Sequence, residues 1–584
     1  MGRRAVKNVP AAVENGAQDV AGGVAVKEAT DAATKAVEDA VKEATDAATK
    51  AVEDAAAAVD NAATALGDEV HKLVQSVSDS LGEGDEGDSE LSMAGFFRGI
   101  PMKAWLLMGL GVAGMAGFIF VRRGSVGPVI GELIAKGRKR LSKRGHPSIC
   151  TYVKLQPAAF NIEDPLKKRK FCAQDIFDVE TKVTSFGNRE WEKTHEKATK
   201  TAAVLGILKE GGATCIGKAV MGDLGFSLIG TNNWLGTPKN PFSTSRICGG
   251  ASCGAAVSVG CNVVDFAIGI DTVGDVRVPA ACCGVLGFRS SHGAVSLEGT
   301  IPVASSCDAL GWFARDAGLL RLVGRQLYPH FVMDGRGPKR FYMAHDVFKL
   351  SSVSHMRTGD VLARSVQRTC GRHTLHNLNF LDHLEHHVAS ISKFKKELQR
   401  MGVDESKYTA LDVLRDSMIL FQRHEFKCNH EEWIKKAKPR LPKTVEMQIQ
   451  KAVFSPNSEA LRFVAVQVRE EMQKVMNKLL KNDAVLVVPA LPSVPPKLAA
   501  PPDELELFEY RTHALMSIAT MSGCCQVIIP LGRDEVPMSV SLLGRKGADL
   551  LLLETVVLLH TTIQQEVLVI NNPNLPITAF LGIK

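Results

Sequence analysis

The stretch that decides the fold runs from Arg246 to Asp316 and is rich in glycine. It reads RICGGASCGAAVSVG (246–260), then DFAIGIDTVGDVRVPAACCGVLGFRSSHG (265–293), then GTIPVASSCDALGWFARD (299–316). Glycine is needed where backbone comes close to backbone or to a ligand, because a Cβ would block the approach. The stretch therefore predicts closely packed loops around a functional site.

The motifs of this stretch resemble those of the amidase signature family. That family carries a Gly-Gly-Ser-Ser-Gly-Gly loop, followed by a Gly-x-Asp-x-Gly-Gly-Ser loop that leads into Arg-x-Pro-Ala. In the first loop Gly249 and Gly250 match, and Ser252 matches the second serine. The matches in and after the second loop are Gly269, Asp271, Thr272, Gly274 and Arg277. The resemblance implies an α/β fold in which a large mixed, twisted sheet is flanked by helices.

Three positions depart from the catalytic Lys-Ser-Ser set that the resemblance implies. Gln174, in FCAQDIFDV (171–179), stands where the family carries the catalytic lysine. Ala251 replaces the serine that relays the proton, and Asp275 replaces the nucleophilic serine. A hydroxyl nucleophile needs a base beside it, and a carboxamide does not accept a proton near neutral pH. We therefore predict a pseudo-amidase without catalytic residues.

Asp275 is also expected to disturb the family's oxyanion site. That site uses backbone N–H groups of the second loop, which here runs from Thr272 through Val273 and Gly274 to Asp275. A carboxylate beside these donors would repel a second negative charge. Loss of a single oxyanion donor typically lowers the rate by about 10² to 10³, so the combined losses predict no useful turnover.

The same loops are still expected to form a binding cleft. The residues predicted to line it are Gly249, Gly250, Ser252, Thr272, Val273, Gly274 and Arg277. The alternative is an active amidase with an unusual nucleophile, for which Ser252 and Cys253 are the candidates. Neither has an evident base, so we expect Ser252 to bond to loop backbone and Cys253 to pack as a small apolar residue.

Two further motifs are expected to carry no chemistry, and we predict neither a metal nor a cofactor. Gly212 to Lys218 fits the phosphate-binding pattern Gly-x-x-x-x-Gly-Lys, but Ala219 follows where a hydroxyl for magnesium is needed. His383 and His387 have the i, i+4 spacing of a metal pair. The same stretch, read as helical, also holds His373, His376 and His386. No cysteine or carboxylate completes a ligand set, so a solvated helix face is expected.

Landmarks of the family continue to about residue 570. The segments NDAVLVVPALPSVPP (482–496), SGCCQVIIPLG (522–532) and VPMSVSLLGRKGAD (536–549) resemble the family's late strands. Residues 327–481 match poorly and are expected to be mostly helices with exposed charge. We therefore assign residues 146–575 to one amidase-like domain.

The N-terminal part differs in composition. The segment VKEATDAATKAVEDA occurs twice without change, at residues 26–40 and 41–55. Residues 1–95 hold 8 basic and 19 acidic side chains, a net charge of −11, whereas the remainder carries +18. The apolar stripe of the repeat contains only alanine and valine. Residues 1–95 are therefore predicted to be disordered or to form a fluctuating amphipathic helix.

The segment AWLLMGLGVAGMAGFIFV (104–121) contains no charged residue. Its eighteen residues are just long enough to cross a hydrocarbon core about 30 Å thick. The following linker, residues 122–145, is basic and is predicted to face the cytosol by the positive-inside tendency. We therefore predict one transmembrane helix that anchors the chain in a membrane.

The anchor and the altered motifs are similar to those of amidase-like receptors in the translocon of the plant chloroplast outer envelope. The resemblance implies a single-pass protein of the chloroplast outer membrane, or alternatively of the mitochondrial outer membrane, that binds preproteins and other import components. Those receptors end in tetratricopeptide repeats, and no 34-residue repeat occurs here, so direct chaperone docking is not expected. A nucleic-acid partner is not expected either. The alternatives are an active amidase and a non-catalytic sensor that binds an amide without cutting it.

Overall fold

The computed structural model describes residues 146–157, 164–328, 337–352, 355–454, 459–533 and 536–571. The predicted acidic region (1–95), membrane anchor (104–121) and basic linker (122–145) lie outside these residues and stay predictions. Among the residues described, no helix combines the length and the apolar character that a membrane span requires.

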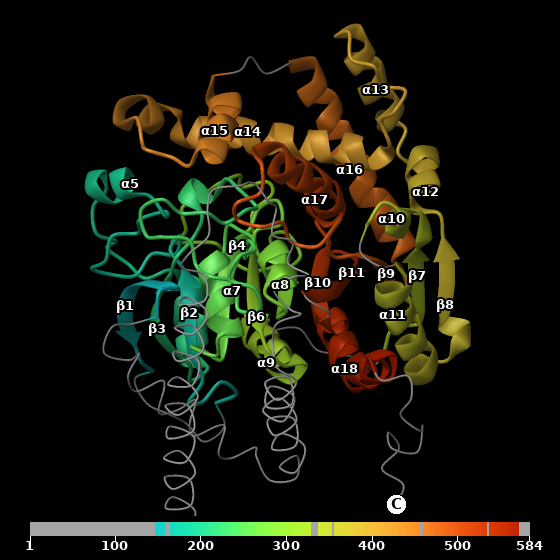
Figure 1. Ribbon diagram of the computed structural model, residues 1–584, viewed down its shortest axis with the longest axis horizontal. Coiled ribbons are helices and arrows are strands. Elements are labelled where there is room, and N and C mark those ends of the chain that lie inside the picture. The colour runs from blue at the N-terminus through green and yellow to red at the C-terminus, as the bar shows by residue number, and fades with distance from the viewer. Residues whose placement is uncertain are drawn as a thin grey trace, which may run out of the picture. The chain divides into compact units, whose positions relative to one another are not determined.

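One large mixed sheet forms the centre of the described part of the chain (Figure 1). Its strands are β1 (Ile149–Leu155), β2 (Lys170–Gln174), β3 (Thr214–Ala219), β4 (Phe266–Asp271), β5 (Leu286–Arg289), β6 (Ala309–Ala314), β7 (Arg340–Ala344), β8 (Leu375–Leu378), β9 (Ala484–Pro489), β10 (Cys525–Arg533) and β11 (Pro537–Gly544). They follow the order β1-β3-β2-β4-β6-β5-β10-β11-β9-β7-β8. Strand β2 is parallel to β3 and β4, and β7 is parallel to β8 and β9, while the remaining pairs are antiparallel.

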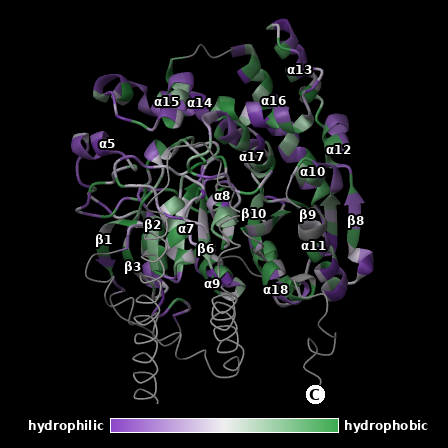
Figure 2. Ribbon diagram, in the orientation of Figure 1, coloured by the Kyte–Doolittle hydropathy of each residue, from purple (hydrophilic) through white to green (hydrophobic). Residues whose placement is uncertain are grey.

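Helices pack on both faces of this sheet. They are α5 (Arg189–Thr194), α6 (Ala203–Glu210), α7 (Cys253–Gly260), α8 (Arg277–Cys282), α9 (Ala317–Leu327), α10 (His345–Lys349), α11 (His355–Cys370), α12 (Phe380–His387), α13 (Ser390–Arg400), α14 (Ala410–Ala437), α15 (Lys443–Val453), α16 (Glu459–Leu479), α17 (Pro502–Ser522) and α18 (Asp549–Asn571), with 3-10 turns η2 (Asp223–Gly225) and η3 (Arg372–Thr374). Neighbouring residues of β4 enter different clusters: Ala267 packs with α7 and α8, whereas Phe266 and Ile268 pack with α9 and α18. The central strands carry mostly hydrophobic residues, and the outlying α5 is hydrophilic (Figure 2). The predicted α/β fold is confirmed.

Local sequence explains where several of these elements begin and end. The Asp316 side chain accepts a hydrogen bond from the Leu319 N–H and caps the start of α9. Thr409 and Asp412 form a capping box that starts the long helix α14. Helix α17 ends at Gly523, whose φ of 69° lies in the left-handed region that favours glycine.

The late strands agree with the sequence, and the middle of the domain agrees in part. Strands β9, β10 and β11 fall in the segments that resemble the family's late strands. Residues 327–481 are mostly helical, as expected, but they also contribute β7 and β8 to the sheet. The prediction that the histidines share one helix is wrong, because His373 lies in η3 and His376 in the edge strand β8. A four-residue edge strand with two exposed polar residues, LHNL, carries too little apolar pattern to be predicted.

Candidate functional site

The first glycine loop, Gly249–Ser252, lies against backbone on both sides. A Cβ added to Gly250 would lie 2.5 Å from the Ser227 carbonyl oxygen and 2.6 Å from the Gly230 Cα atom. Gly249 has a φ of 73°, and its own Cβ would lie 2.9 Å from the Pro279 backbone at the start of α8. Only glycine fits at these two positions. This packing holds Ala251 and Ser252 close to the end of β2 and to the loop that follows β4.

Gln174 ends strand β2 and is fixed by hydrogen bonds. Its Oε1 atom accepts one bond from the Ser252 hydroxyl, at 2.9 Å, and one from the Ile270 N–H, at 2.8 Å. Its Nε2 atom points to the Met221 sulfur, 3.8 Å away. Gln174 and Ser252 are both buried. The carboxamide therefore joins β2, the first loop and β4, and it supplies no proton acceptor at the lysine position.

Asp275 occupies a cradle of backbone N–H donors in the second loop. Its Oδ2 atom accepts hydrogen bonds from the N–H groups of Thr272 and Val273, each at 3.0 Å. Its Oδ1 atom accepts from the Ala251 N–H, also at 3.0 Å. Burial and the nearby Asp271 carboxylate raise the pKa of Asp275 to about 7, although the three N–H groups act in the opposite direction. The Asp275 side chain thus occupies backbone donors of both glycine loops.

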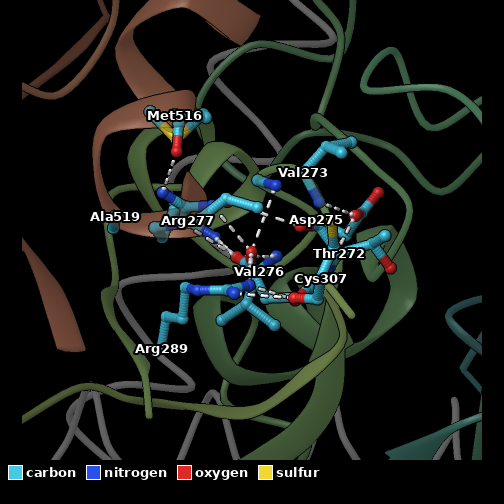
Figure 3. Close-up of polar contacts among 12 residues, drawn as sticks. Thr272, Val273, Asp275, Val276, Arg277, Arg289, Cys307, Met516 and Ala519 are labelled. Atoms are coloured by element: carbon cyan, nitrogen blue, oxygen red, sulfur yellow. Dashed lines mark hydrogen bonds and ion pairs between the residues drawn. The ribbon is translucent and has the colours of Figure 1, made fainter. Parts of the chain in front are cut away.

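A buried ionic network supports this loop from below (Figure 3). The two oxygens of Asp271 accept bonds from Arg277 Nη2 and Nε at 2.8 and 3.1 Å, and Oδ1 lies 2.7 Å from Arg289 Nη1. Arg277 also donates to the Met516 carbonyl and to Gln526 Oε1, at 2.9 and 2.6 Å. Burial alone would raise the pKa of Asp271, but the two guanidinium groups hold it well below its ordinary value. The network ties β4, α8, β5 and α17 together.

Lys218 lies on the neighbouring strand β3, where it pairs with Ala173, the residue before Gln174. Sequence reasoning treats it only as part of a phosphate-loop match, but it lies within a strand and not in a loop. Its Nζ atom lies 2.5 Å from Asp175 Oδ1 and 3.0 Å from the Thr184 hydroxyl, and it is fully buried. These contacts tie strand β3 to the segment that follows β2.

The residues predicted from sequence to form the site do lie together. Gln174 bonds to Ser252, the Ser252 N–H donates to the Asp275 carbonyl at 3.1 Å, and the Ala251 N–H donates to the Asp275 carboxylate. Ser252 bonds to a side chain, whereas loop backbone was expected to be its partner. Cys253 is buried among apolar residues, as expected.

The residues predicted to line a binding cleft lie in the protein interior. All the residues concerned are buried: Gly249, Gly250, Ser252, Thr272, Val273, Gly274 and Arg277. Arg277 is fully enclosed, and each of its three side-chain nitrogens bonds to protein. A ligand could reach Arg277 only by breaking that network, so its position does not match a lining residue.

Two supporting contacts have no signal in the sequence. The Glu509 carboxylate of α17 accepts bonds from the Ser227 hydroxyl and the Leu228 N–H, at 2.7 and 2.8 Å, and so holds the segment that packs on Gly250. Asp308 accepts a bond from the Thr272 hydroxyl at 2.7 Å. Both contacts join segments distant in sequence, and neither carboxylate belongs to a recognisable motif.

The fold and the glycine loops define the class of this protein. The family described as Amidase matches residues 171–553. The chain therefore belongs to the amidase family.

The relatives of the chain include a translocon component, an outer envelope protein and an amidase. The translocon at the outer membrane of chloroplasts 64 of Pisum sativum is 39% identical, covering 79% of this chain and 75% of its own length. The mitochondrial outer envelope protein 64 of Arabidopsis thaliana is 40% identical over 69% of this chain and 66% of its own. Amidase 1 of Arabidopsis thaliana is 40% identical over 69% of this chain and 95% of its own. Sequence identity to this chain is therefore nearly the same for the envelope proteins and for the amidase.

Solved structures agree on the fold. A crystal structure of an amidase superposes with a TM-score of 0.57 at 20% identity, covering 73% of this chain and 95% of the other. At that identity the likeness concerns the fold alone.

Proposed function

We propose that the chain is a non-catalytic, membrane-anchored amidase-like receptor or scaffold that binds preproteins at the chloroplast outer envelope. The proposal combines three lines of support: the chemistry of the buried site, the names of the relatives, and the anchor predicted at residues 104–121. Each line bears on a different part of the proposal.

The observation that carries the non-catalytic part is the position of the Asp275 carboxylate. It fills the three backbone donors of Ala251, Thr272 and Val273, so an oxyanion would have to displace a covalently attached acceptor. The proton-accepting side of the site is missing as well, because Gln174 replaces the lysine and Ala251 replaces the relay. Turnover by the family's chemistry would need all three positions to change.

The import part of the proposal rests on relatives. A relative of 39% identity is named as a translocon component of the chloroplast outer membrane. The mitochondrial outer membrane is the alternative location, because a relative of 40% identity bears that name. Both locations agree with a single-pass anchor ahead of the amidase-like domain.

A binding measurement tests the receptor role directly. The full chain is reconstituted in vesicles, and a fluorescent chloroplast preprotein is titrated against the same protein without its targeting sequence. We expect at least about tenfold tighter binding of the complete preprotein. A mitochondrial preprotein in the same assay distinguishes the two envelopes. Equal binding of the preproteins and the shortened protein, or no binding of any, would contradict the receptor role.

The second candidate is an active amidase with an unusual nucleophile, favoured by the 40% identity to Amidase 1. Ser252 and Cys253 are the candidate nucleophiles, but both are buried, and the Ser252 hydroxyl donates its hydrogen bond to Gln174, which is no base. A non-catalytic amide sensor is the third. Hydrolysis of amides supports the enzyme, whereas saturable binding of a small amide without cleavage and without preprotein binding supports the sensor.

A further inference from the structure

The described residues line a cavity of about 370 Å³ that is open to solvent on one side, in the helical layer and away from the buried site. It lies among α13, α14, α15, α16 and α17, which Figure 1 shows grouped together above the sheet. Pockets for small molecules commonly occupy about 300 to 1,000 Å³. The volume is therefore sufficient for a small organic ligand.

One wall of the cavity is apolar. It consists of Phe394, Leu398, Ile419, Leu420 and Leu461, contributed by α13, α14 and α16. Phe394, Leu398 and Leu461 are themselves buried, while Ile419 and Leu420 are partly exposed toward the cavity. A wall of this kind favours a ligand with an apolar part, because burying apolar surface stabilises by about 25 cal/mol per Å².

Helix α14 also contributes two arginines to the lining, and they are in very different states. Arg415 is neutralised by Asp412 and Asp416, at 2.6 and 2.8 Å, and its guanidinium lies 3.5 Å from the centre of the Tyr510 ring. Arg423, two turns further along α14, makes no ion pair among the described residues, and its buried Nε atom has no hydrogen-bond partner there. Asp416 acts on Arg423 electrostatically, but its carboxylate already bonds to Arg415. Within the described part of the chain, Arg423 is therefore the arginine of this cavity without a carboxylate of its own within ion-pair distance.

The remaining inner groups do not supply a carboxylate for Arg423. Glu509 uses its carboxylate on the Ser227 hydroxyl and the Leu228 N–H. Burial and the two arginines lower the pKa of His513 to about 3, so the imidazole is neutral. Lys451 and Glu506, of opposite charge, are both exposed at the rim. The interior thus combines an apolar wall with one unpaired guanidinium.

Helix α17 connects this cavity with the buried site. Glu509 and His513 line the cavity, while Met516 and Thr520 contact Arg277. The spacing 509, 513, 516, 520 places all four on one face of the helix. A ligand in the cavity would therefore contact the same helix face that supports the second loop.

From these observations we propose that the cavity is a binding site for a carboxylate with an apolar tail, whose carboxylate pairs with Arg423. A guanidinium is the side chain best suited to a planar carboxylate, since it can donate two parallel hydrogen bonds. The carboxylate could come from an aliphatic acid or from the C-terminus of a peptide, because both present the same group. The site goes beyond the proposed receptor role and does not depend on it.

Calorimetric titration of the full chain tests this assignment with named probes. Octanoate and N-acetyl-leucine represent the aliphatic acid and the peptide C-terminus, and octanamide is the uncharged match of octanoate. We expect one acid to bind with saturation and octanamide to bind about tenfold or more weakly, because a hydrogen bond to a charged group is lost. The acid that binds more tightly identifies the source of the carboxylate.

Two substitutions locate the site. Arg423→Gln should weaken binding of the acid about tenfold or more, and Leu420→Trp should weaken it by filling the cavity. Arg511→Gln is the matched control, because Arg511 is an exposed arginine of α17 that does not line this cavity. Thermal unfolding of each variant establishes that it is folded. The assignment is overturned if neither acid binds, if octanoate binds and octanamide binds as tightly, or if folded Arg423→Gln binds the acid like the native chain.

Discussion

At the scale of single residues, Asp275 changes the site more than the loss of a serine would. A serine at this position would leave these N–H groups free for a ligand, whereas the carboxylate accepts from two N–H groups of its own loop and from the Ala251 N–H of the first loop. Gln174 acts in the same direction, since its Oε1 atom ties Ser252 to the Ile270 N–H. Gln174 and Asp275 thus serve as structural links between the loops of the buried site.

Removal of the Asp275 carboxylate should leave an empty anion site. In Asp275→Ala three buried N–H groups lose their acceptor, so the free energy of unfolding should fall by about 1 to 3 kcal/mol. Formate should then raise the melting temperature of this variant, because it binds the folded state at the vacated donors. Sodium chloride at the same ionic strength is the control. An equal effect of formate on the native chain would exclude this explanation.

Asp271 should contribute to stability in a pH-dependent way. In Asp271→Asn the guanidinium groups of Arg277 and Arg289 stay buried without a counter-charge, which should lower the free energy of unfolding by about 3 to 5 kcal/mol. The pKa of Asp271 is lowered in the folded state, so its contribution is present above the unfolded value of about 3.9 and is lost as the pH falls below it. Urea unfolding at pH 7 and below pH 4 measures the difference. If the difference in the free energy of unfolding between the native chain and Asp271→Asn does not become smaller in acid, the ion pair is not its cause.

At the scale of elements, the residues of the site are positioned by short helices and loops that pack directly against the backbone of neighbouring segments. Helix α7 begins directly after the first loop, and its Gly254 has no room: a Cβ would lie 2.5 Å from the Val220 carbonyl oxygen and 2.7 Å from that of Ser148. Gly206 in α6 also lies inside a helix, but no atom lies within 4 Å of its Cβ position. Glycine is therefore required by close packing in α7, whereas a side chain can be accommodated at Gly206 in α6.

This contrast predicts stability changes of opposite sign for one substitution. Gly206→Ala should raise the free energy of unfolding by about 0.5 to 1 kcal/mol, because alanine is the better helix former. Gly254→Ala should lower it by about 1 to 3 kcal/mol, since overpacking outweighs that gain. Chemical denaturation of both variants provides the comparison. Stabilisation by Gly254→Ala would mean that α7 packs less closely than described.

The sequence predicts elements with strong local patterns and misses those defined by their neighbours. Strand β9 is a continuous apolar run and β10 contains the apolar run VIIPL, and the glycine loops are recognisable because close backbone approach restricts their composition. Strand β8 could not be predicted, since its four residues gain their strand geometry from pairing with β7. At the site, the three altered positions follow from motif spacing. The bonds from Glu509 to the Ser227 segment join residues about 280 positions apart and leave no local pattern.

At the scale of the whole molecule, the described residues form one mixed sheet with helices on both faces, the fold shared with solved amidase structures. The amidase family matches residues 171–553, and relatives of nearly equal identity are named as a translocon component and as an amidase. The fold alone therefore does not decide the function. The decision rests on whether the buried cluster of Gln174, Ala251 and Asp275 can turn over an amide.

Amide hydrolysis by the full native chain, across a panel of aliphatic and aromatic amides, tests that central claim most directly. The matched protein is the Gln174→Lys, Ala251→Ser, Asp275→Ser variant, which restores base, relay and nucleophile. We predict no turnover above background by the native chain. Turnover by the triple variant would additionally indicate that the surrounding pocket is intact. Saturable hydrolysis by the native chain, abolished by Ser252→Ala, would contradict the non-catalytic account.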